Sequence, residues 1–137
     1  MWMLDTNTCS FVIRHRPLSV KDRFDAVGHA NLAISVVVLA ELLFGAEKHP
    51  TQGAAIRGDI EDFRRRLRVV PWSETAAEVY ARIRAHLKRQ GMPIGNMDLL
   101  IAAHALAEDA VLVTNNTHEF CRVPELKLED WVSLPGN

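Results

Sequence analysis

Residues 31–46 read NLAISVVVLAELLFGA, and this stretch contains the repeating unit of the fold. Its first part, Asn31 to Ser35, has the length and apolar content of a buried strand. Ser35 is of a residue type that accepts a hydrogen bond from the first turn of a helix, so it is predicted to cap a long helix that ends near His49 and Pro50. The stretch therefore predicts a strand followed directly by a helix.

The same alternation of short apolar segments and longer helical segments continues along the chain. It is typical of βαβ units, so we expect an α/β fold with a short parallel β-sheet flanked by helices on both faces. No linker, repeat or low-complexity tract divides residues 1–137, so a single domain is expected. The predicted strands are Trp2 to Leu4, Asn31 to Ser35, Val69-Val70, Val111 to Thr114 and Trp131 to Leu134; the predicted helices cover residues 7–14, 19–28, 36–49, 51–67, 73–91 and a segment that opens near Met97.

Three acidic residues lie inside or next to apolar runs. Asp5 follows the apolar segment 2–4, Glu41 is the only charged residue in 36–46, and Asp98 opens the apolar segment 99–103. Burying an ionised carboxylate is costly unless it is paired, hydrogen-bonded or bound to a metal. Because no basic residue lies within these runs, a shared divalent cation is the economical explanation. The three acids therefore indicate metal-assisted chemistry on an anionic substrate.

The predicted elements bring the three acids to one edge of the sheet. Asp5 falls at the carboxyl end of the first strand, Glu41 in the helix after the second strand, and Asp98 in the first turn of a helix. Asn115 and Asn116 follow another strand, and ligands of open parallel sheets bind outside the carboxyl ends of the strands. Two carboxylates about 5 Å apart repel by roughly 3 kcal/mol at an effective dielectric near ~20. A hard cation such as Mg²⁺ or Mn²⁺ relieves this repulsion through oxygen ligands.

Each of the three acids also has a purely structural explanation. Asp5 can cap the first helix, Asp98 can complement a helix N-terminus, and Glu41 can pair with a distant arginine. These explanations are independent of one another, and helix capping leaves Glu41 unexplained. We therefore expect a shared site, and we expect His104 to be a hydrogen-bonded core residue.

Charge and composition restrict the function further. The net charge is only −1, which argues against a protein that coats nucleic acid through a general positive field. Cys9 and Cys121 lack CxxC spacing, no histidine pair has i, i+4 spacing, and no glycine-rich phosphate loop is found, so zinc hydrolases and nucleotide triphosphatases are disfavoured. Since no run approaches the roughly 20 apolar residues that span a bilayer and no signal-type segment opens the chain, we expect a soluble cytoplasmic protein without membrane contact.

Basic residues cluster in the middle of the chain and predict a local contact with nucleic acid. Arg82, His86 and Arg89 fall on one face of the helix predicted over residues 73–91, and the segment Arg64 to Arg68 adds further positive charge. Phosphate contacts are expected there. A solvated helix face is the alternative interpretation.

Four segments resemble the PIN-domain ribonuclease toxins of the VapC family in order, spacing and chain length. They are residues 3–7 (MLDTN), 40–42 (AEL), 94–105 (IGNMDLLIAAHA) and 113–120 (VTNNTHEF). The resemblance covers essentially the whole chain and implies a parallel-sheet PIN fold and a Mg²⁺- or Mn²⁺-dependent endoribonuclease. It also implies a cognate VapB antitoxin that blocks the site and binds operator DNA, with toxin homodimers inside a larger toxin–antitoxin assembly.

The resemblance assigns roles to individual residues. Asp5, Glu41 and Asp98 match the acidic metal-site positions of the family, at which the cation and a carboxylate activate water for phosphodiester hydrolysis. Thr6 and Thr114 match its supporting hydroxyls.

Two further positions follow from the same resemblance. The fourth acidic position of many PIN domains falls on Asn116, whose amide ligates a cation without adding negative charge. Glu119, about one helical turn further on, is the candidate substitute. Residues 114–120 resemble the segment of enteric VapC toxins that cut the initiator tRNA in its anticodon loop, so this tRNA is the expected substrate.

Three other functions remain open. A phosphoryl-transfer fold of the receiver or haloacid-dehalogenase type also combines Asp with Mg²⁺, but a dehalogenase-like site needs a second Asp where this chain has Asn7. A structure-specific DNA nuclease of the same superfamily usually needs a longer chain with clamp insertions. A partner-binding module could keep the fold and lack activity because of Asn116.

Overall fold

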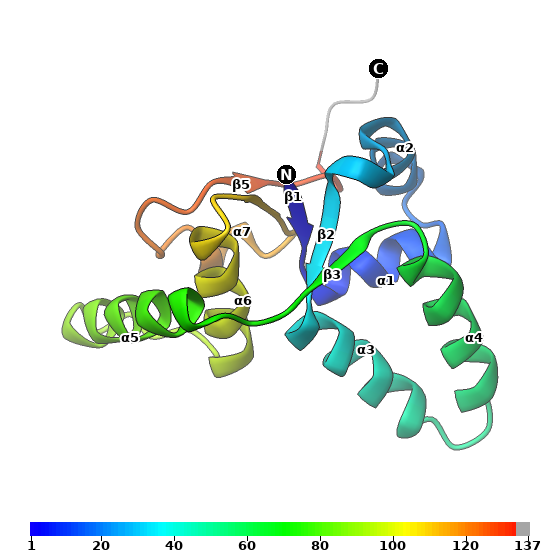
Figure 1. Cartoon of the computed structure of the whole chain (residues 1–137), viewed down its shortest axis with the longest axis horizontal. Helices are drawn as coiled ribbons and strands as arrows, with labels where there is room; N and C mark the ends of the chain where they lie inside the picture. The colour runs from blue at the N-terminus through cyan, green and yellow to red at the C-terminus, as the bar shows by residue number, and fades with distance from the viewer. Residues whose placement is uncertain (134–137) are drawn as a thin grey trace.

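Five parallel strands form one sheet within residues 1–133, which the computed structural model describes. Their order is β3-β2-β1-β4-β5, so the first strand of the chain lies in the centre of the sheet (Figure 1). The predicted parallel sheet is therefore confirmed. The strands are β1 Trp2–Leu4, β2 Leu32–Ser35, β3 Arg68–Val70, β4 Val111–Val113 and β5 Leu128–Glu129.

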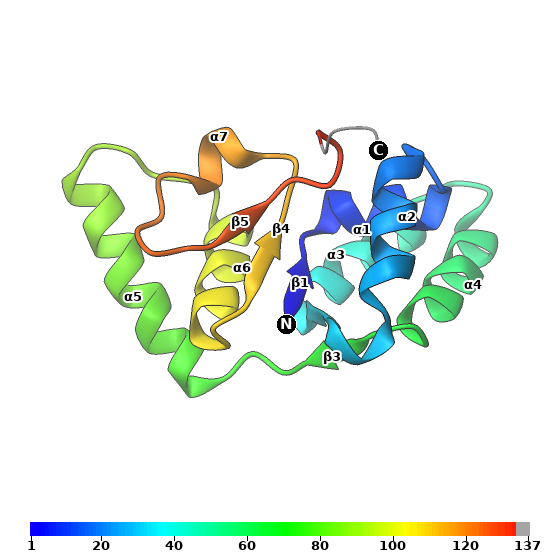
Figure 2. The ribbon, with the colours of Figure 1, turned by 90° about the horizontal axis from the view of Figure 1, so that it is seen from above.

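The helices form two groups with the sheet between them. Helices α5 and α6 pack together at the left of Figures 1 and 2, and α1, α2 and α4 lie at the right. Helix α3 contacts both groups, through α6 on one side and through α1 and α4 on the other. The helices are α1 Thr6–Arg14, α2 Leu18–Val27, α3 Val36–Glu47, α4 Gly53–Arg64, α5 Glu74–Arg89, α6 Asn96–Ala107 and α7 Thr117–Phe120, with a 3₁₀ turn at His29–Asn31.

Burial on both faces explains why the strands are short apolar runs without alternation. Every residue of β2 is buried, as parallel strands covered by helices require. Helix α6 is apolar on almost all sides because it packs in the interior, and Asp98 stands at its first turn. Within residues 1–133 no helix is long and apolar enough to cross a bilayer.

The prediction of the last strand was wrong. It was placed at Trp131 to Leu134, whereas β5 is Leu128–Glu129 and pairs with β4. The apolar residue Trp131 suggested a strand, but its side chain packs in the core from outside any strand, with 1% of its surface exposed. Leu134 lies outside the described residues.

Helix boundaries differ from the predicted ones by a few residues. Helix α4 covers only Gly53–Arg64 of the predicted 51–67, and α2 begins after Pro17 without a side-chain cap. Helix α7 was not predicted, because four residues carry too little periodicity to identify a helix. Ser35 caps α3 as predicted, since its hydroxyl accepts the N–H of Val37 at 3.1 Å.

Candidate active site

Asp5 lies directly after the carboxyl end of β1 and is the first residue of the candidate site along the chain. Its Oδ1 accepts the backbone N–H of Thr8 at 2.9 Å, so it does cap α1, and its Oδ2 accepts the hydroxyl of Thr114 at 2.6 Å. Burial raises the pKa of the Asp5 carboxyl, and these hydrogen bonds oppose the rise. Each carboxylate oxygen has a second lone pair, so capping leaves Asp5 free to bind a further group.

Glu41 lies half-buried in the second turn of α3. The hydroxyl of Thr6, the first residue of α1, donates to its Oε1 at 2.5 Å. Among the residues described, no basic side chain lies within ion-pairing distance of Glu41. The distant arginine considered as an explanation for Glu41 is therefore not observed.

Asp98 lies half-buried in the first turn of α6 and is the most strongly perturbed carboxyl of the site. Its pKa is raised from 3.8 to about 6, first by burial and then by the negative charges of Glu119, Asp5 and Glu41. An effect of this kind requires each of these three carboxylates to lie close enough to repel Asp98. Side chains from β1, α3, α6 and α7 thus share one electrostatic environment at the edge of the sheet.

Glu119 joins α7 to the beginning of α6. Its Oε1 accepts the N–H of Gly95 at 2.9 Å, and its Oε2 accepts the side-chain amide of Asn116 at 2.8 Å. These hydrogen bonds hold the pKa of Glu119 below its usual value. Gly95 is the N-cap of α6 and has no side chain of its own to cap the helix; Glu119 accepts its N–H from another element, as the glutamate of a capping box does.

Thr114 connects the residues that follow β4 with Asp5. Its side chain is buried, its hydroxyl donates to Asp5, and the same oxygen accepts the N–H of Asn116 at 2.9 Å. The two residues taken as supporting hydroxyls, Thr6 and Thr114, therefore each orient one of the three acids. The sequence analysis did not identify Thr8, whose N–H donates to Asp5 and whose hydroxyl donates to the carbonyl of Val113, or Gly95, whose N–H donates to Glu119.

His104 is a buried, hydrogen-bonded core residue, as predicted. Its Nδ1 shares a 2.7 Å hydrogen bond with the hydroxyl of Ser35, and burial lowers its pKa. Ser35 caps the helix that carries Glu41, and His104 lies on the helix that carries Asp98. No local sequence pattern predicts this contact, because the two residues are 69 positions apart.

The oxygen donors of the site fit a hard divalent cation. As the side chains stand, no three Asp, Glu, His or Cys residues in 1–133 are near enough together to bind an ion by themselves. Mg²⁺ usually keeps several waters and uses only one or two protein carboxylates. The crowding of negative charge around Asp98 is the feature of this structure that a cation would relieve.

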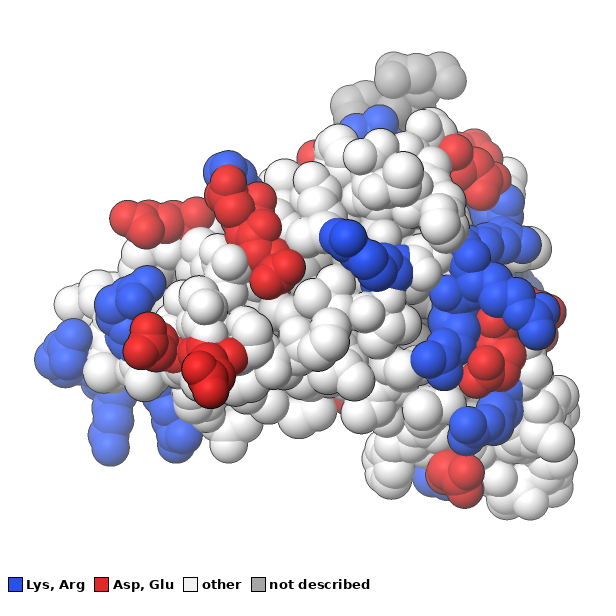
Figure 3. Space-filling view, in the orientation of Figure 1, with Lys and Arg blue, Asp and Glu red and all other residues white. Residues whose placement is uncertain are grey.

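The two basic clusters predicted to meet nucleic acid differ in their ion pairing. On α4, Arg64 and Arg65 pair with Glu61 and Asp62 at 3.5 and 3.1 Å. On α5, Arg82, His86 and Arg89 have no carboxylate within 4.0 Å in the part of the chain that is described. Figure 3 shows blue and red mixed over α4 at the right, and blue side chains projecting from α5 at the left. Within the described residues, positive charge without a carboxylate partner is therefore found on α5, and in the other cluster only at Arg66 and Arg68.

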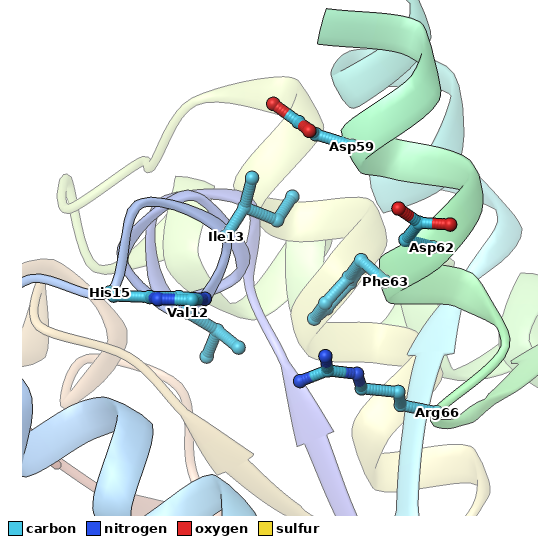
Figure 4. Close-up of a pocket in the computed structure, with 7 residues that line it drawn as sticks. All are labelled: Val12, Ile13, His15, Asp59, Asp62, Phe63 and Arg66. Carbon is cyan, nitrogen blue, oxygen red and sulfur yellow. The ribbon is translucent and has the colours of Figure 1, made fainter.

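A groove runs between α1 and α4 and reaches the site. One hollow of about 520 Å³ includes Thr6, Glu41 and Ile13 in its lining, and a second of about 270 Å³ continues from Ile13. Figure 4 shows Ile13 and Phe63 projecting into the space between the two helices, with Asp59 at one end and Arg66 at the other. The groove is lined by apolar side chains and by charged ones of both signs, among them Glu41, Asp59 and Arg66.

Comparison with known proteins gives one consistent result. The family model described as PIN domain matches residues 2–126. The tRNA(fMet)-specific endonuclease VapC of Shigella flexneri is 45% identical over 132 residues, covering 95% of this chain and 97% of that protein. Ribonuclease VapC2 of Rickettsia felis is 41% identical over 132 residues, covering 96% and 98%. The crystal structure of DNA-bound VapBC from Salmonella typhimurium matches with a TM-score of 0.89 and 41% identity, covering 95% of this chain and 97% of that one.

Proposed function

Since the chain belongs to the PIN-domain family, and within it to the VapC ribonucleases of toxin–antitoxin systems, we propose that it is a Mg²⁺- or Mn²⁺-dependent endoribonuclease toxin that cuts initiator tRNA. The relative from Shigella flexneri is named for its specificity for tRNA(fMet). Cleavage in the anticodon loop, as the segment 114–120 suggests, would inhibit translation.

One observation supports metal dependence above the others. The pKa of Asp98 is raised to about 6 by burial and by the charges of Glu119, Asp5 and Glu41. A fold that brings carboxylates together without basic partners stores repulsion, which a divalent cation relieves.

Asp5, Glu41 and Asp98, with the amide of Asn116, would hold the cation, which supplies an activated water and neutralises charge on the attacked phosphate. The protein's own contribution is orientation. Thr6 fixes Glu41, Thr114 fixes Asp5, and Glu119 holds the first turn of α6. Water attacks phosphorus and its proton passes to a site carboxylate; the bond from phosphorus to the 3′ oxygen breaks, and the departing oxygen takes up a proton from solvent water. The products are a 5′-phosphate and a 3′-hydroxyl, so the 2′-hydroxyl is not needed as nucleophile.

Substrate docking is assigned to the exposed face of α5. Arg82 and Arg89 are exposed and His86 is half-buried, and none of them is neutralised by a nearby carboxylate within the described residues. Cations of this kind position a phosphate backbone and make its binding salt-dependent.

A VapB-type antitoxin is the proposed partner. The related structures from Salmonella typhimurium and Rickettsia felis are VapBC complexes bound to DNA. Apolar residues of an antitoxin would fill the groove between α1 and α4, and an Arg or Lys would meet the three acids with favourable geometry. Operator DNA would be contacted only through the antitoxin, in an assembly that contains toxin homodimers.

The decisive experiment is a cleavage assay with the purified chain, free of antitoxin, on initiator tRNA and on a DNA duplex with a single-stranded flap. Cleavage of the tRNA in Mg²⁺ or Mn²⁺, with 5′-phosphate ends and none in EDTA, is expected. Products with a 2′,3′-cyclic phosphate, or equal cleavage in EDTA, would contradict the metal mechanism. Preference for the DNA would favour a structure-specific nuclease, and no cleavage of either would favour an inactive partner-binding module.

A further inference from the structure

A pocket that the proposed mechanism does not use lies between the second half of α5 and the beginning of α6. Its volume is about 270 Å³, near the lower end of the range for ligand pockets, about 300 Å³. Leu87, Ile94 and Leu99 give it an apolar lining, and these side chains are almost fully buried. Its polar lining residues are Arg84, Lys88 and Asn96, all of which are exposed.

The two cations of the pocket are available to an anion. Within residues 1–133 neither Arg84 nor Lys88 has a carboxylate within ion-pairing distance, in contrast to the arginines of α4. Arg84 donates to the hydroxyl of Tyr80 at 3.0 Å, and its guanidinium lies 5.8 Å from the centre of that ring. Arg84 is therefore held in place before any ligand arrives.

These cations are distinct from the α5 residues already assigned to substrate docking. At about 100° per residue, Arg84 and Lys88 project from one flank of the buried stripe that contains Ile83 and Leu87. Arg82 and Arg89 project from the opposite flank. The pocket thus provides a second set of contacts on the same helix.

The pocket and the candidate catalytic acid share the first turn of α6 but lie on different sides of the helix, because Asp98 projects about 200° from Asn96 around the helix axis. Asn96 and Leu99 line it, and Asp98 lies between them in sequence on the first turn of α6. A helix is about 10 Å wide and rises about 1.5 Å per residue, so an RNA strand that crosses the start of α6 reaches both places within one or two nucleotides.

We propose that this pocket binds one nucleobase of the RNA, within two nucleotides of the cleaved bond. The base packs on the apolar lining, the Asn96 amide donates to and accepts from its edge, and Lys88 and Arg84 contact the adjacent phosphates. This inference rests on the proposed function. An RNA nucleotide is favoured over an acidic peptide or a second copy of this chain because it combines a flat apolar face with a negative charge and must pass beside Asp98 to be cut.

The test combines a base deletion in the RNA with a pocket-filling substitution in the protein. Stem–loop RNAs that carry one abasic nucleotide at successive positions around the cleaved bond are compared with intact RNA. For the wild type, one position should raise KM about tenfold with little change in kcat, as loss of one stacked base predicts. Asn96→Trp should raise KM on intact RNA by a similar factor, and deletion of that base should then have no further effect. Lys88→Ala should weaken binding, whereas the control Lys48→Ala, which changes an exposed lysine directly after α3, should not.

The same combinations are measured as binding of labelled RNA in EDTA, which requires no cleavage. If the two changes remain fully additive at every position, or if Lys88→Ala alters the oligomeric state and leaves RNA binding intact, the nucleobase pocket is wrong. If the changes are coupled in binding but no RNA is cut, the pocket stands and the proposed nuclease function is wrong.

Discussion

The hydroxyl of Ser35 and Nδ1 of His104 share a 2.7 Å hydrogen bond in the core of the protein. Ser35 ends β2 and caps α3, while His104 is fully buried in α6. The bond joins the helix that carries Glu41 to the helix that carries Asp98. It therefore helps to fix the relative position of two of the three acids.

Replacing His104 by Leu should lower the free energy of unfolding by about 1–3 kcal/mol, because the Ser35 hydroxyl loses its buried partner. The turnover number for RNA should fall as well, since α3 and α6 are less firmly joined. His104→Asn keeps a polar atom near the place of Nδ1 and should recover part of both losses. Chemical denaturation and steady-state kinetics measure the two effects. The control His29→Leu changes an exposed histidine and should shift stability by less than about 0.5 kcal/mol.

Replacing Asp98 by Asn should abolish metal binding and cleavage while leaving the metal-free protein as stable as the wild type or more stable. The reason is that one member of a crowded group of carboxylates is neutralised with little change in shape. The gain is roughly 2 kcal/mol after allowance for solvent screening. Thermal melts in EDTA and in Mn²⁺ measure it, with Asp22→Asn on α2 as the surface control. A mutant that is clearly less stable in EDTA, with an unchanged response to Mn²⁺, would make Asp98 a structural helix-terminus acid.

The stability difference between wild type and Asp98→Asn in EDTA should depend on pH. A carboxyl whose folded-state pKa is about 6, above its ordinary 3.8, destabilises the fold fully above about pH 6 and not at all below about pH 4. The advantage of the mutant should therefore be largest at neutral pH and disappear on acidification. Because the pKa of His104 is lowered, this residue destabilises the fold as pH falls below 6.5. The effect is the same in both proteins and cancels in the difference. An advantage that is constant with pH would contradict the assignment.

Replacing Arg82 and Arg89 together by Ala should weaken RNA binding and reduce the slope of log K against log salt by about 1.4, the value for two phosphate contacts on a single strand. Affinity for Mn²⁺ should not change. The matched control is Arg64→Ala with Arg65→Ala, whose charges are already paired on α4. Equal effects of the two double mutants would make the α5 residues a solvated face only.

An antitoxin that has lost the basic residues of its toxin-binding segment should inhibit the enzyme less, because its remaining apolar residues can fill the groove but leave the three acids without a counter-charge. Inhibition titrations with the intact and the altered antitoxin measure this. An antitoxin altered at basic residues outside that segment is the control. Full inhibition by the altered antitoxin would exclude charge replacement at the acids.

The sequence predicted the part of the fold that depends on local apolar patterns. β1, β2, β3 and β4 were placed to within one residue, because each is a short apolar run beside a helix signal. β5 was missed because it consists of Leu128–Glu129, and its position depends on distant contacts. The Glu129 carboxylate accepts a hydrogen bond at 3.0 Å from the indole of Trp2, 127 positions away, and no local pattern encodes this contact.

The candidate site was predictable to a similar degree. The rule that ligands bind at the carboxyl edge of a parallel sheet placed Asp5, Glu41 and Asp98 together. It did not predict that Glu119 would cap α6 from 24 residues away, nor which arginines would be paired. Both depend on the distances between side chains of separate elements, which only the folded chain determines.

The central position of β1 affects the moment at which the protein becomes active during its own synthesis. Asp5 leaves the ribosome early. In the folded protein its N–H donates a hydrogen bond to the carbonyl of Val113 at 3.0 Å, and its carboxylate accepts one from the hydroxyl of Thr114. Pairings of such long sequence separation form late in folding. In a nascent chain that has not yet exposed β4, the strand that leads to Asp5 is paired on one side only, with β2, and Asn116 and Glu119 are absent from the site. An enzyme proposed to attack translation is thereby kept inert while the ribosome that makes it is still at work.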